Sequence, residues 1–321
     1  MDAAYLPWSS MDQDHSIAIT GGGTSAPVPE GQRHQRAAAR FAEKAPPESF
    51  FLVSAVFHYL GPAFAVLLFS RVAPLGVTWL RIASAAVVFA VWRRPWHSVA
   101  ELEPGNRRLL LRWGLVLAAM NSTFYLAIDR LPLSTVAAIE FLPVIALAAV
   151  GTRTARNIVA LALAVTGVYL LTDVRLAGEP IGFVFAFANA GLFACYIVLG
   201  HRVARNGATA GIDGLAAAML IALVATTPFI GWAAVPALGD PVALLAGIGV
   251  GISSSVVPYV TDQLAMARIA RATYALLVSL LPATATVVGI VVLTQIPALI
   301  EIVGVILVIG AVAVHRDSGS G

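Results

Sequence analysis

Charged residues are scarce in this sequence. Asp, Glu, Lys and Arg make up 12% of the 321 residues, whereas soluble globular domains contain about 25%. Hydrophobic residues make up 59%, and the mean hydropathy is +0.86. A large aqueous domain would need more polar surface than this composition supplies. We therefore predict an integral membrane protein.

Lysine, cysteine and histidine are also rare, which excludes several kinds of site. The single lysine, Lys44, lies in a polar N-terminal stretch. The rest of the chain can therefore form neither a Walker A phosphate loop nor a Schiff base. The single cysteine, Cys195, permits no internal disulfide, and the six histidines lack zinc-ligand spacing. We expect no ATP hydrolysis, no metal and no cofactor.

The basic excess is small, with a formal net charge of +3 and a pI near 9.3. The arginines lie at the ends of apolar stretches rather than on one face. We therefore interpret them as topology signals and expect no nucleic-acid partner. Residues 1–46 are polar and contain no apolar run like that of a signal peptide, so we predict a disordered cytoplasmic tail there.

Beyond the tail, the chain has room for about ten spanning helices of ~20 residues each with short loops. Uncharged stretches between Pro, Gly and Arg lie near residues 50–70, 75–92, 109–129, 132–151, 157–173, 180–201, 211–232, 240–262, 272–293 and 298–314. With the N-terminus inside, sixteen of the 20 Lys and Arg residues fall on the inner side and three on the outer side. This bias predicts that both termini are cytoplasmic in an inner or plasma membrane.

The chain also repeats itself weakly. Residues 130–143 resemble residues 269–282, and residues 61–71 resemble residues 191–201. Because each half would hold five spans, the halves must have opposite orientations, which is the inverted-repeat plan of many secondary transporters. That plan places a substrate site between the halves near the midplane.

We therefore predict an all-α polytopic membrane protein with ten transmembrane helices in two inverted five-helix repeats. The predicted divisions are the tail at 1–46, the first repeat at 47–176, the second repeat at 177–316 and a C-terminal tail at 317–321.

Four ionisable residues within the apolar stretches are candidates for function, because a charge at the bilayer centre costs roughly 2.5 to 3.5 kcal/mol on insertion scales. Glu140 precedes Pro143, which can loosen its helix, and Asp262 lies towards the inner end of the eighth stretch. Both are candidates for proton exchange, and the alternative for each is a structural carboxylate. Arg81 and His58 are candidate charge partners. Arg81 could instead snorkel to the headgroups, and His58 could simply pack.

Neutral polar residues gather in the third and eighth stretches. Asn121 and Tyr125 are four residues apart and share a helix face, while residues 253–255, Tyr259 and Thr261 gather in the eighth stretch. Two such faces in repeat-related stretches favour a polar cavity, although Ser and Thr also bond to their own helix backbone.

These residues resemble a known family. The most specific match is formed by residues 120–121 (MN), 124–128 (FYLAI), 131–133 (LPL), 138–141 (AIEF) and Pro143. This pattern is similar to the third and fourth spans of inner-membrane threonine and homoserine exporters, in the EamA-type branch of the drug/metabolite transporter superfamily. Further agreement is found at Gly76, Val77, Thr78, Leu80, Arg81, Tyr196, Ile197, Gly200, Arg202, Pro258, Tyr259, Ala265, Arg268, Thr273, Ser279, Pro282 and Ala283.

The resemblance covers roughly residues 50–316 and implies a ten-helix carrier that exports small amino acids, driven by the proton gradient. By position, it implies that Glu140 and Asp262 couple protons. The substrate-binding residues that it implies are Asn121, Tyr125, Tyr196, Tyr259 and Ser279.

Three positions depart from the family pattern. The exporters carry a lysine near Val66 and glutamates at Leu281 and Gln295, and all three charges are absent here. An amino-acid zwitterion needs a partner for each of its charges, so these losses leave open whether the substrate is threonine, homoserine or a less polar metabolite.

Other functions remain to be weighed against proton-coupled export. One is uncoupled movement of a neutral or lipophilic compound. Two others, from different classes, are a non-transporting membrane scaffold and an intramembrane enzyme, although the sequence offers no paired catalytic residues for the latter. The expected partners are a small-molecule substrate, protons and the lipid bilayer, in a monomer or a homodimer.

Overall fold

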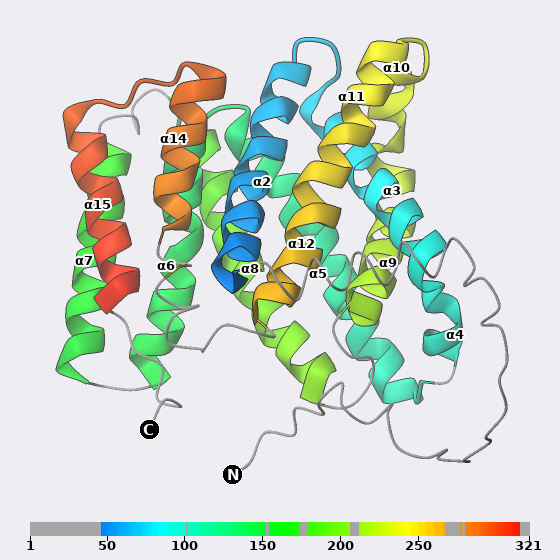
Figure 1. Ribbon diagram of the computed structural model, residues 1–321, viewed down its shortest axis with the longest axis horizontal. Coiled ribbons are helices and arrows are strands. Elements are labelled where there is room, and N and C mark those ends of the chain that lie inside the picture. The colour runs from blue at the N-terminus through cyan, green and yellow to red at the C-terminus, as the bar shows by residue number, and fades with distance from the viewer. Residues whose placement is uncertain are drawn as a thin grey trace, which may run out of the picture. The chain divides into compact units, whose positions relative to one another are not determined.

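The computed structural model describes residues 46–100, 102–151, 154–173, 179–205, 212–266, 277 and 280–314. Within these residues the regular elements are all helices, and there is no strand (Figure 1). The longer helices are α2 (Pro47–Leu68), α3 (Pro74–Arg93), α5 (Pro104–Ile128), α6 (Leu133–Gly151), α7 (Ala155–Asp173), α8 (Pro180–Arg205), α9 (Ile212–Ile230), α11 (Pro241–Gly251), α12 (Val257–Met266), α14 (Leu281–Leu293) and α15 (Leu299–Val314). The short elements are α4 (Pro95–Ala100), η2 (Gly231–Ala234), α10 (Val235–Leu238) and the π-helical turn η3 (Ile252–Val256).

Proline marks where many of these helices begin. A proline occupies the first or second position of α2, α3, α5, α11 and α14, where its missing N–H costs nothing because first-turn donors have no helical acceptor. Asp240 completes the start of α11, because its carboxylate accepts hydrogen bonds from the backbone nitrogens of Val242 at 3.0 Å and Ala243 at 3.2 Å. Several of the prolines that bound the apolar stretches of the sequence therefore lie at helix starts in the structure.

Six helical segments among the described residues are long and apolar enough to cross a membrane: Ser49–Leu68, Pro74–Arg93, Pro104–Ile128, Pro180–Gly200, Ile212–Leu238 and Pro241–Thr261. Shorter apolar helices lie at Leu133–Pro143, Ala155–Leu170, Leu281–Leu293 and Leu299–Val314. The prediction of an all-helical, multi-pass membrane protein is confirmed. The inverted repeat of ten spanning helices stays a prediction.

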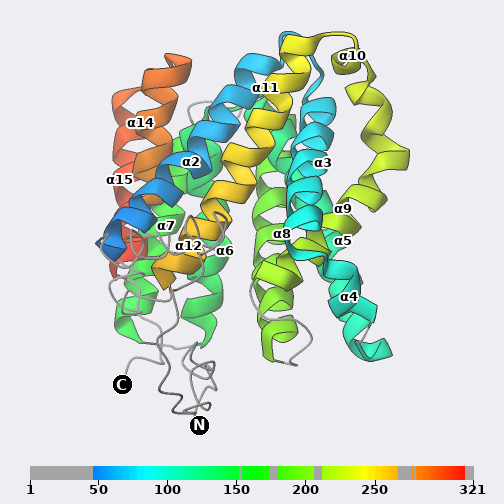
Figure 2. The same ribbon diagram turned by 45° about the vertical axis from the view of Figure 1, so that its right-hand side comes forward.

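Helices from the first part of the chain pack mainly against helices from the second part. The main contacts pair α2 with α12 and α14, α3 with α9 and α11, α5 with α8 and α9, α6 with α8 and α14, and α7 with α15. Figures 1 and 2 both show α15 alongside α7, and α11 and α12 running alongside α2. Segments that are far apart in the sequence thus form most of the interior.

The outer surface carries many large apolar side chains. Val91, Phe229, Leu245, Val291 and Ile296 are among those that are more than half exposed. Such a surface is unfavourable in water and suits contact with lipid tails. It agrees with the membrane location that the composition predicts.

Two glycines allow the helices around η3 to approach one another closely. A Cβ atom on Gly61 of α2 would lie 2.8 Å from the Cα atom of Ser254, and one on Gly251 would lie 2.7 Å from the carbonyl oxygen of Arg81. Both distances are shorter than any Cβ contact that a folded protein accepts. Gly61 and Gly251 therefore bring α2, α3 and η3 together around the polar groups described next.

Candidate functional site

Buried polar side chains from six elements meet in the interior. We call this set the central polar cluster: Tyr59 (α2), Arg81 (α3), Tyr125 (α5), Glu140 (α6), Asn189 (α8), and Ser254 and Ser255 (η3). Each of these side chains is at most 9% exposed. Burial of polar groups at this density is costly unless partners compensate it, so their partners indicate what the cluster can do.

Arg81 is the positive charge of the cluster. Its Nε atom donates a hydrogen bond to the Ser255 hydroxyl at 3.0 Å, and Nη2 donates to the Ser254 carbonyl oxygen at 3.2 Å. The guanidinium also lies 5.3 Å from the centre of the Tyr125 ring, a cation–π distance. Arg81 is therefore held inside the protein by neutral partners rather than snorkelling to the headgroups.

The Ser254 carbonyl is available to Arg81 because of Pro258. Proline has no N–H, so the carbonyl four residues before it loses its usual helical donor. Here that carbonyl belongs to Ser254, in a π-helical turn of the kind that often marks functional sites. The guanidinium thus supplies the donor that the helix backbone lacks.

Prolines in α2 and α6 have the same position relative to the cluster as Pro258. A cluster residue lies three positions before each of the three prolines: Tyr59 before Pro62, Glu140 before Pro143, and Ser255 before Pro258. Each proline leaves a carbonyl beside the cluster residue without its α-helical N–H donor. Backbone acceptors therefore accompany the polar side chains.

Glu140 is the negative charge of the cluster. It is 7% exposed, and its Oε1 atom accepts a hydrogen bond from the Asn189 side-chain amide at 3.2 Å. Glu140 lies within electrostatic reach of Arg81 and Tyr59, yet no ion pair joins Glu140 to Arg81 in the described part of the chain. The two oppositely charged side chains are close enough to interact electrostatically, but they do not form an ion pair.

Several buried polar atoms have no hydrogen-bond partner within the described residues: Tyr59 OH, Tyr125 OH, Thr135 Oγ1 and Asn189 Oδ1. The Tyr125 hydroxyl lies near Ser254 and Arg81 without reaching hydrogen-bond geometry. An unmet buried polar group costs about 1–3 kcal/mol, and three of these four atoms, all but Thr135 Oγ1, belong to the central polar cluster, where they call for a ligand or water. Both charges of the cluster lie next to such atoms.

The structure brings Arg81, Tyr125 and Glu140, three of the residues singled out in the sequence, into the cluster. His58 lies beside it, half-buried, with its ring edge-on to Tyr59 at 5.1 Å between ring centres. Asn121 is buried, and its side-chain amide donates to the Leu117 carbonyl of its own helix at 2.8 Å.

The other candidates lie elsewhere or outside the described residues. Tyr196 stacks on Trp113 with ring centres 5.4 Å apart, and Tyr259 packs against the same apolar core formed by α3, α5 and α9. Ser279 lies outside the described residues. For Asp262 the structure describes the backbone, within α12, but not the side chain.

Tyr59 and Asn189 belong to the cluster but were missed from the sequence. Tyr59 is adjacent to His58, and Asn189 is the one carboxamide in the apolar stretch of α8. A search for isolated side-chain amides within apolar stretches, in addition to charges, would have found Asn189.

The three positions that lack the family's charges have ordinary packing roles here. Val66 and Leu281 lie against the main apolar core. Gln295 Oε1 accepts a hydrogen bond from the backbone nitrogen of Leu133 at 3.2 Å and so caps the start of α6. No group of three or more His, Cys, Asp or Glu residues that could hold a metal occurs among the described residues.

Comparison with known proteins identifies the family of this chain. No family model matches the sequence. Threonine/homoserine exporter RhtA of Salmonella typhimurium (strain SL1344) is 31% identical over 251 residues, which cover 78% of this chain and 84% of the exporter. The RhtA of Escherichia coli (strain K12) is 31% identical over 244 residues, covering 73% of this chain and 79% of that protein. The chain therefore belongs to the family of RhtA-type threonine/homoserine exporters.

Proposed function

We propose that the chain exports a small amino acid, such as threonine, homoserine or a close relative, across the inner membrane, and that the central polar cluster binds it. The observation that carries this proposal is the pair of buried opposite charges, Arg81 and Glu140, that do not pair with each other. Charged residues inside the membrane typically mark substrate and ion pathways. The names of the relatives supply the substrate class.

The cluster offers a partner for each charge of a zwitterion. The α-carboxylate would lie at Arg81, whose planar guanidinium suits carboxylates, beside the unmet Tyr125 hydroxyl. The α-ammonium would lie at Glu140, beside the unmet Asn189 Oδ1 and Tyr59 OH atoms. Arg81 and Glu140 would thus serve the zwitterion although the family's charges are absent at Val66, Leu281 and Gln295.

We propose further that Glu140 exchanges a proton during the cycle. A carboxylate held between an amide and apolar side chains can carry a proton in one state of the carrier and release it in the other. Asp262 remains the second candidate for this role. Antiport follows if the proton and the substrate ammonium compete for the same oxygen atoms.

Movement between two access states would use the inverted repeat predicted from the sequence. If α2, α3, α5, α6 and α7 correspond in order to α8, α9, α11–α12, α14 and α15, exchanging the halves maps the main contacts between the halves onto one another. The contact of α2 with α12 becomes that of α8 with α5, and α2 with α14 becomes α8 with α6. The contact of α3 with α11 becomes that of α9 with α5, while α3 with α9, α6 with α14 and α7 with α15 map onto themselves. This symmetry supports rocking of one half against the other.

The proposed topology keeps both termini in the cytoplasm, as the distribution of arginines favours. A cysteine at Ser318, in a chain from which Cys195 has been removed, should then resist an impermeant thiol reagent in intact cells. Labelling of that cysteine would reverse the topology.

Reconstituted vesicles provide the direct test of function. The full-length protein, placed in liposomes with an imposed pH gradient, should move radiolabelled threonine or homoserine, and dissipating the gradient should abolish accumulation. Two analogues of the substrate test the two charges: an amino alcohol that lacks the carboxylate and a hydroxy acid that lacks the ammonium. Each should compete with radiolabelled threonine at least about tenfold more weakly than unlabelled threonine does, because each leaves one buried charge of the protein unmet.

A different outcome would favour the alternative function. Gradient-independent movement of a neutral or lipophilic compound, with no transport of amino acids, would make the protein an uncoupled carrier. The apolar side chains of Val66 and Leu281, at positions charged in the exporters, are the feature that would favour this result.

A further inference from the structure

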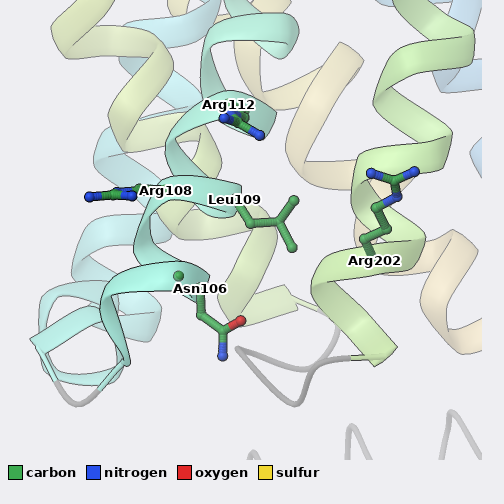
Figure 3. Close-up of a pocket in the computed structure, with 6 residues that line it drawn as sticks. Asn106, Arg108, Leu109, Arg112 and Arg202 are labelled. Carbon is green, nitrogen blue, oxygen red and sulfur yellow. The ribbon is translucent and has the colours of Figure 1, made fainter.

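A basic hollow lies outside the central polar cluster, between the first turns of α5 and the last turns of α8. Its volume is about 420 Å³, and the residues that line it are Gly105, Asn106, Arg108, Leu109, Arg112 and Arg202. Figure 3 shows Arg202 on α8 across the hollow from Leu109 and Asn106 on α5, while Arg108 turns to the other side of α5. We call this hollow the basic pocket.

The positive charges of the basic pocket have no anionic partner in the described part of the chain. Arg112 and Arg202 are both exposed, and neither forms an ion pair there. No acidic residue lines the pocket. Two guanidinium groups on facing helices therefore keep their hydrogen-bond donors available for an anion.

The start of α5 adds further donors to the same pocket. Pro104 occupies the first turn, and the preceding Glu103 makes no side-chain cap hydrogen bond. The backbone N–H groups of Gly105 and Asn106 therefore lack a helical acceptor, and both residues line the pocket. Helix starts with free N–H groups attract phosphate and other anions. The arginines and the helix start thus favour the same kind of ligand.

Exposed apolar side chains lie about one turn away from these two arginines along the same helices. Leu115, three residues after Arg112 on α5, is 45% exposed, and Val198, four residues before Arg202 on α8, is 39% exposed. A small soluble anion would not use these side chains. A ligand with an anionic head and a hydrocarbon tail would use both the charges and the apolar side chains.

We propose that the basic pocket binds the phosphate group of an anionic phospholipid, with Arg112 and Arg202 as its main ligands. The lipid's acyl chains would lie along Leu115 and Val198. Arginine suits this role because its planar fork binds phosphate oxygens in pairs, and basic pockets between membrane helices commonly take lipid head groups. This inference does not depend on the identity of the exported substrate.

The test uses the purified full-length protein in detergent, titrated with phosphatidylglycerol and, separately, with the zwitterionic phosphatidylethanolamine. Native mass spectrometry counts the bound lipids. We expect a retained phosphatidylglycerol whose affinity falls by about tenfold or more in the double variant Arg112→Gln/Arg202→Gln, since each charged hydrogen bond contributes to binding. Arg94→Gln is the matched control, because Arg94 is exposed but lies outside the pocket, and it should bind the lipid like the wild type.

A soluble anion distinguishes the two sources of phosphate. Glycerol 3-phosphate, which carries the head group without tails, should displace the lipid only at concentrations at least about a hundredfold higher, because it loses the burial of apolar surface. Equal competition by glycerol 3-phosphate would overturn the lipid assignment, as would equal phosphatidylglycerol binding by the double variant and the wild type. If the double variant does not insert into the membrane, phosphatidylglycerol binding to the wild type is measured at several salt concentrations instead. Raised salt should release the lipid, and lipid binding that does not change with salt would overturn the proposal.

Discussion

The two halves of the chain contribute different chemistry to the central polar cluster. Helices before residue 173 supply both charges, Arg81 and Glu140, as well as the two tyrosines, whereas helices after residue 179 supply only neutral groups, Asn189, Ser254 and Ser255. Each charge crosses to a neutral partner of the other half, Arg81 to the serines and Glu140 to the amide. These interior hydrogen bonds between the halves therefore each join a charged side chain of the first half to a neutral group of the second half.

The exposed ends of the helices show the opposite arrangement. There Arg71 pairs with Asp240 at 2.9 Å, and Arg93 pairs with both oxygens of Asp213 at 2.5 and 2.9 Å. In both pairs the first half supplies the arginine and the second half supplies the acid. In these two pairs the charges are thus neutralised across the interface, whereas Arg81 and Glu140 in the interior are not.

One buried acid of the second half completes the comparison. Glu301 in α15 is 3% exposed, and its Oε2 atom accepts a hydrogen bond from the backbone nitrogen of Ala298 at 2.9 Å. Its position in the first turn of α15 suits a helix cap, because carboxylates stabilise helix N-termini. Glu140 lies mid-helix and accepts a hydrogen bond from the side-chain amide of Asn189, whose own oxygen is unmet. The two buried glutamates thus differ in their surroundings: Glu301 caps a helix start, and Glu140 is the residue for which we propose proton exchange.

The largest effect is expected when Glu140 is made permanently neutral. Glu140→Gln keeps the size and most hydrogen bonds of the side chain but cannot exchange a proton, so gradient-driven export should fall by roughly tenfold or more while insertion is unchanged. Glu301→Gln is the matched control and should leave export within about twofold of the wild type, because an amide oxygen can still accept the cap hydrogen bond. Export at several external pH values, normalised to the protein in the membrane, is the measurement. Export by Glu140→Gln with the wild-type level and pH dependence would remove Glu140 from the mechanism.

The sequence predicted the helices well and the charged residues of the site partly. Long apolar stretches bounded by Pro and Arg specify membrane helices directly, and a buried charge such as Glu140 stands out because it is costly. Asn189 gives a weaker signal, since a neutral amide in an apolar stretch costs less than a charge. Its role depends on α8 meeting α6, a contact between segments 49 residues apart that helical periodicity within one segment does not encode.

The next effect is expected when the charge of Arg81 is kept but its shape is changed. Arg81→Lys keeps the positive charge, but a single ammonium cannot reach both the Ser255 hydroxyl and the Ser254 carbonyl in the fixed geometry of a guanidinium. Leaving one buried partner unmet should lower stability by about 1–3 kcal/mol and weaken zwitterion binding. Thermal unfolding in detergent and the apparent KM for threonine measure the two effects. An unchanged KM would show that Arg81 holds η3 in place without contacting the substrate.

An effect on stability alone is expected when the halves are pushed apart without any change in charge. Gly251→Ala places a Cβ atom 2.7 Å from the Arg81 carbonyl oxygen, and overpacking of this kind typically costs about 1–3 kcal/mol. Gly249 offers a matched control two residues away, since a Cβ there meets no atom within 4 Å. Gly249→Ala should be neutral or stabilise its helix by up to about 1 kcal/mol. The two thermal midpoints should therefore move in opposite directions, and equal midpoints would show that the contact between the halves is loose at η3.

The smallest effect is expected at the exposed end of the interface. Hydrogen bonds from the backbone nitrogen of Ala243 and from Arg71 hold the pKa of Asp240 below its ordinary value of 3.8. Because the folded-state pKa is lowered, the stability that Asp240 contributes is complete above about pH 4 and is lost as the pH falls through the folded-state pKa. Asp240→Asn keeps an acceptor for the cap but removes the charge, so its Tm should be slightly below that of the wild type at about pH 7, and the gap should close on acidification towards about pH 3. A difference in Tm that stays constant over this pH range would show that Asp240 acts only by capping α11. Its ion pair with Arg71 would then contribute nothing to stability.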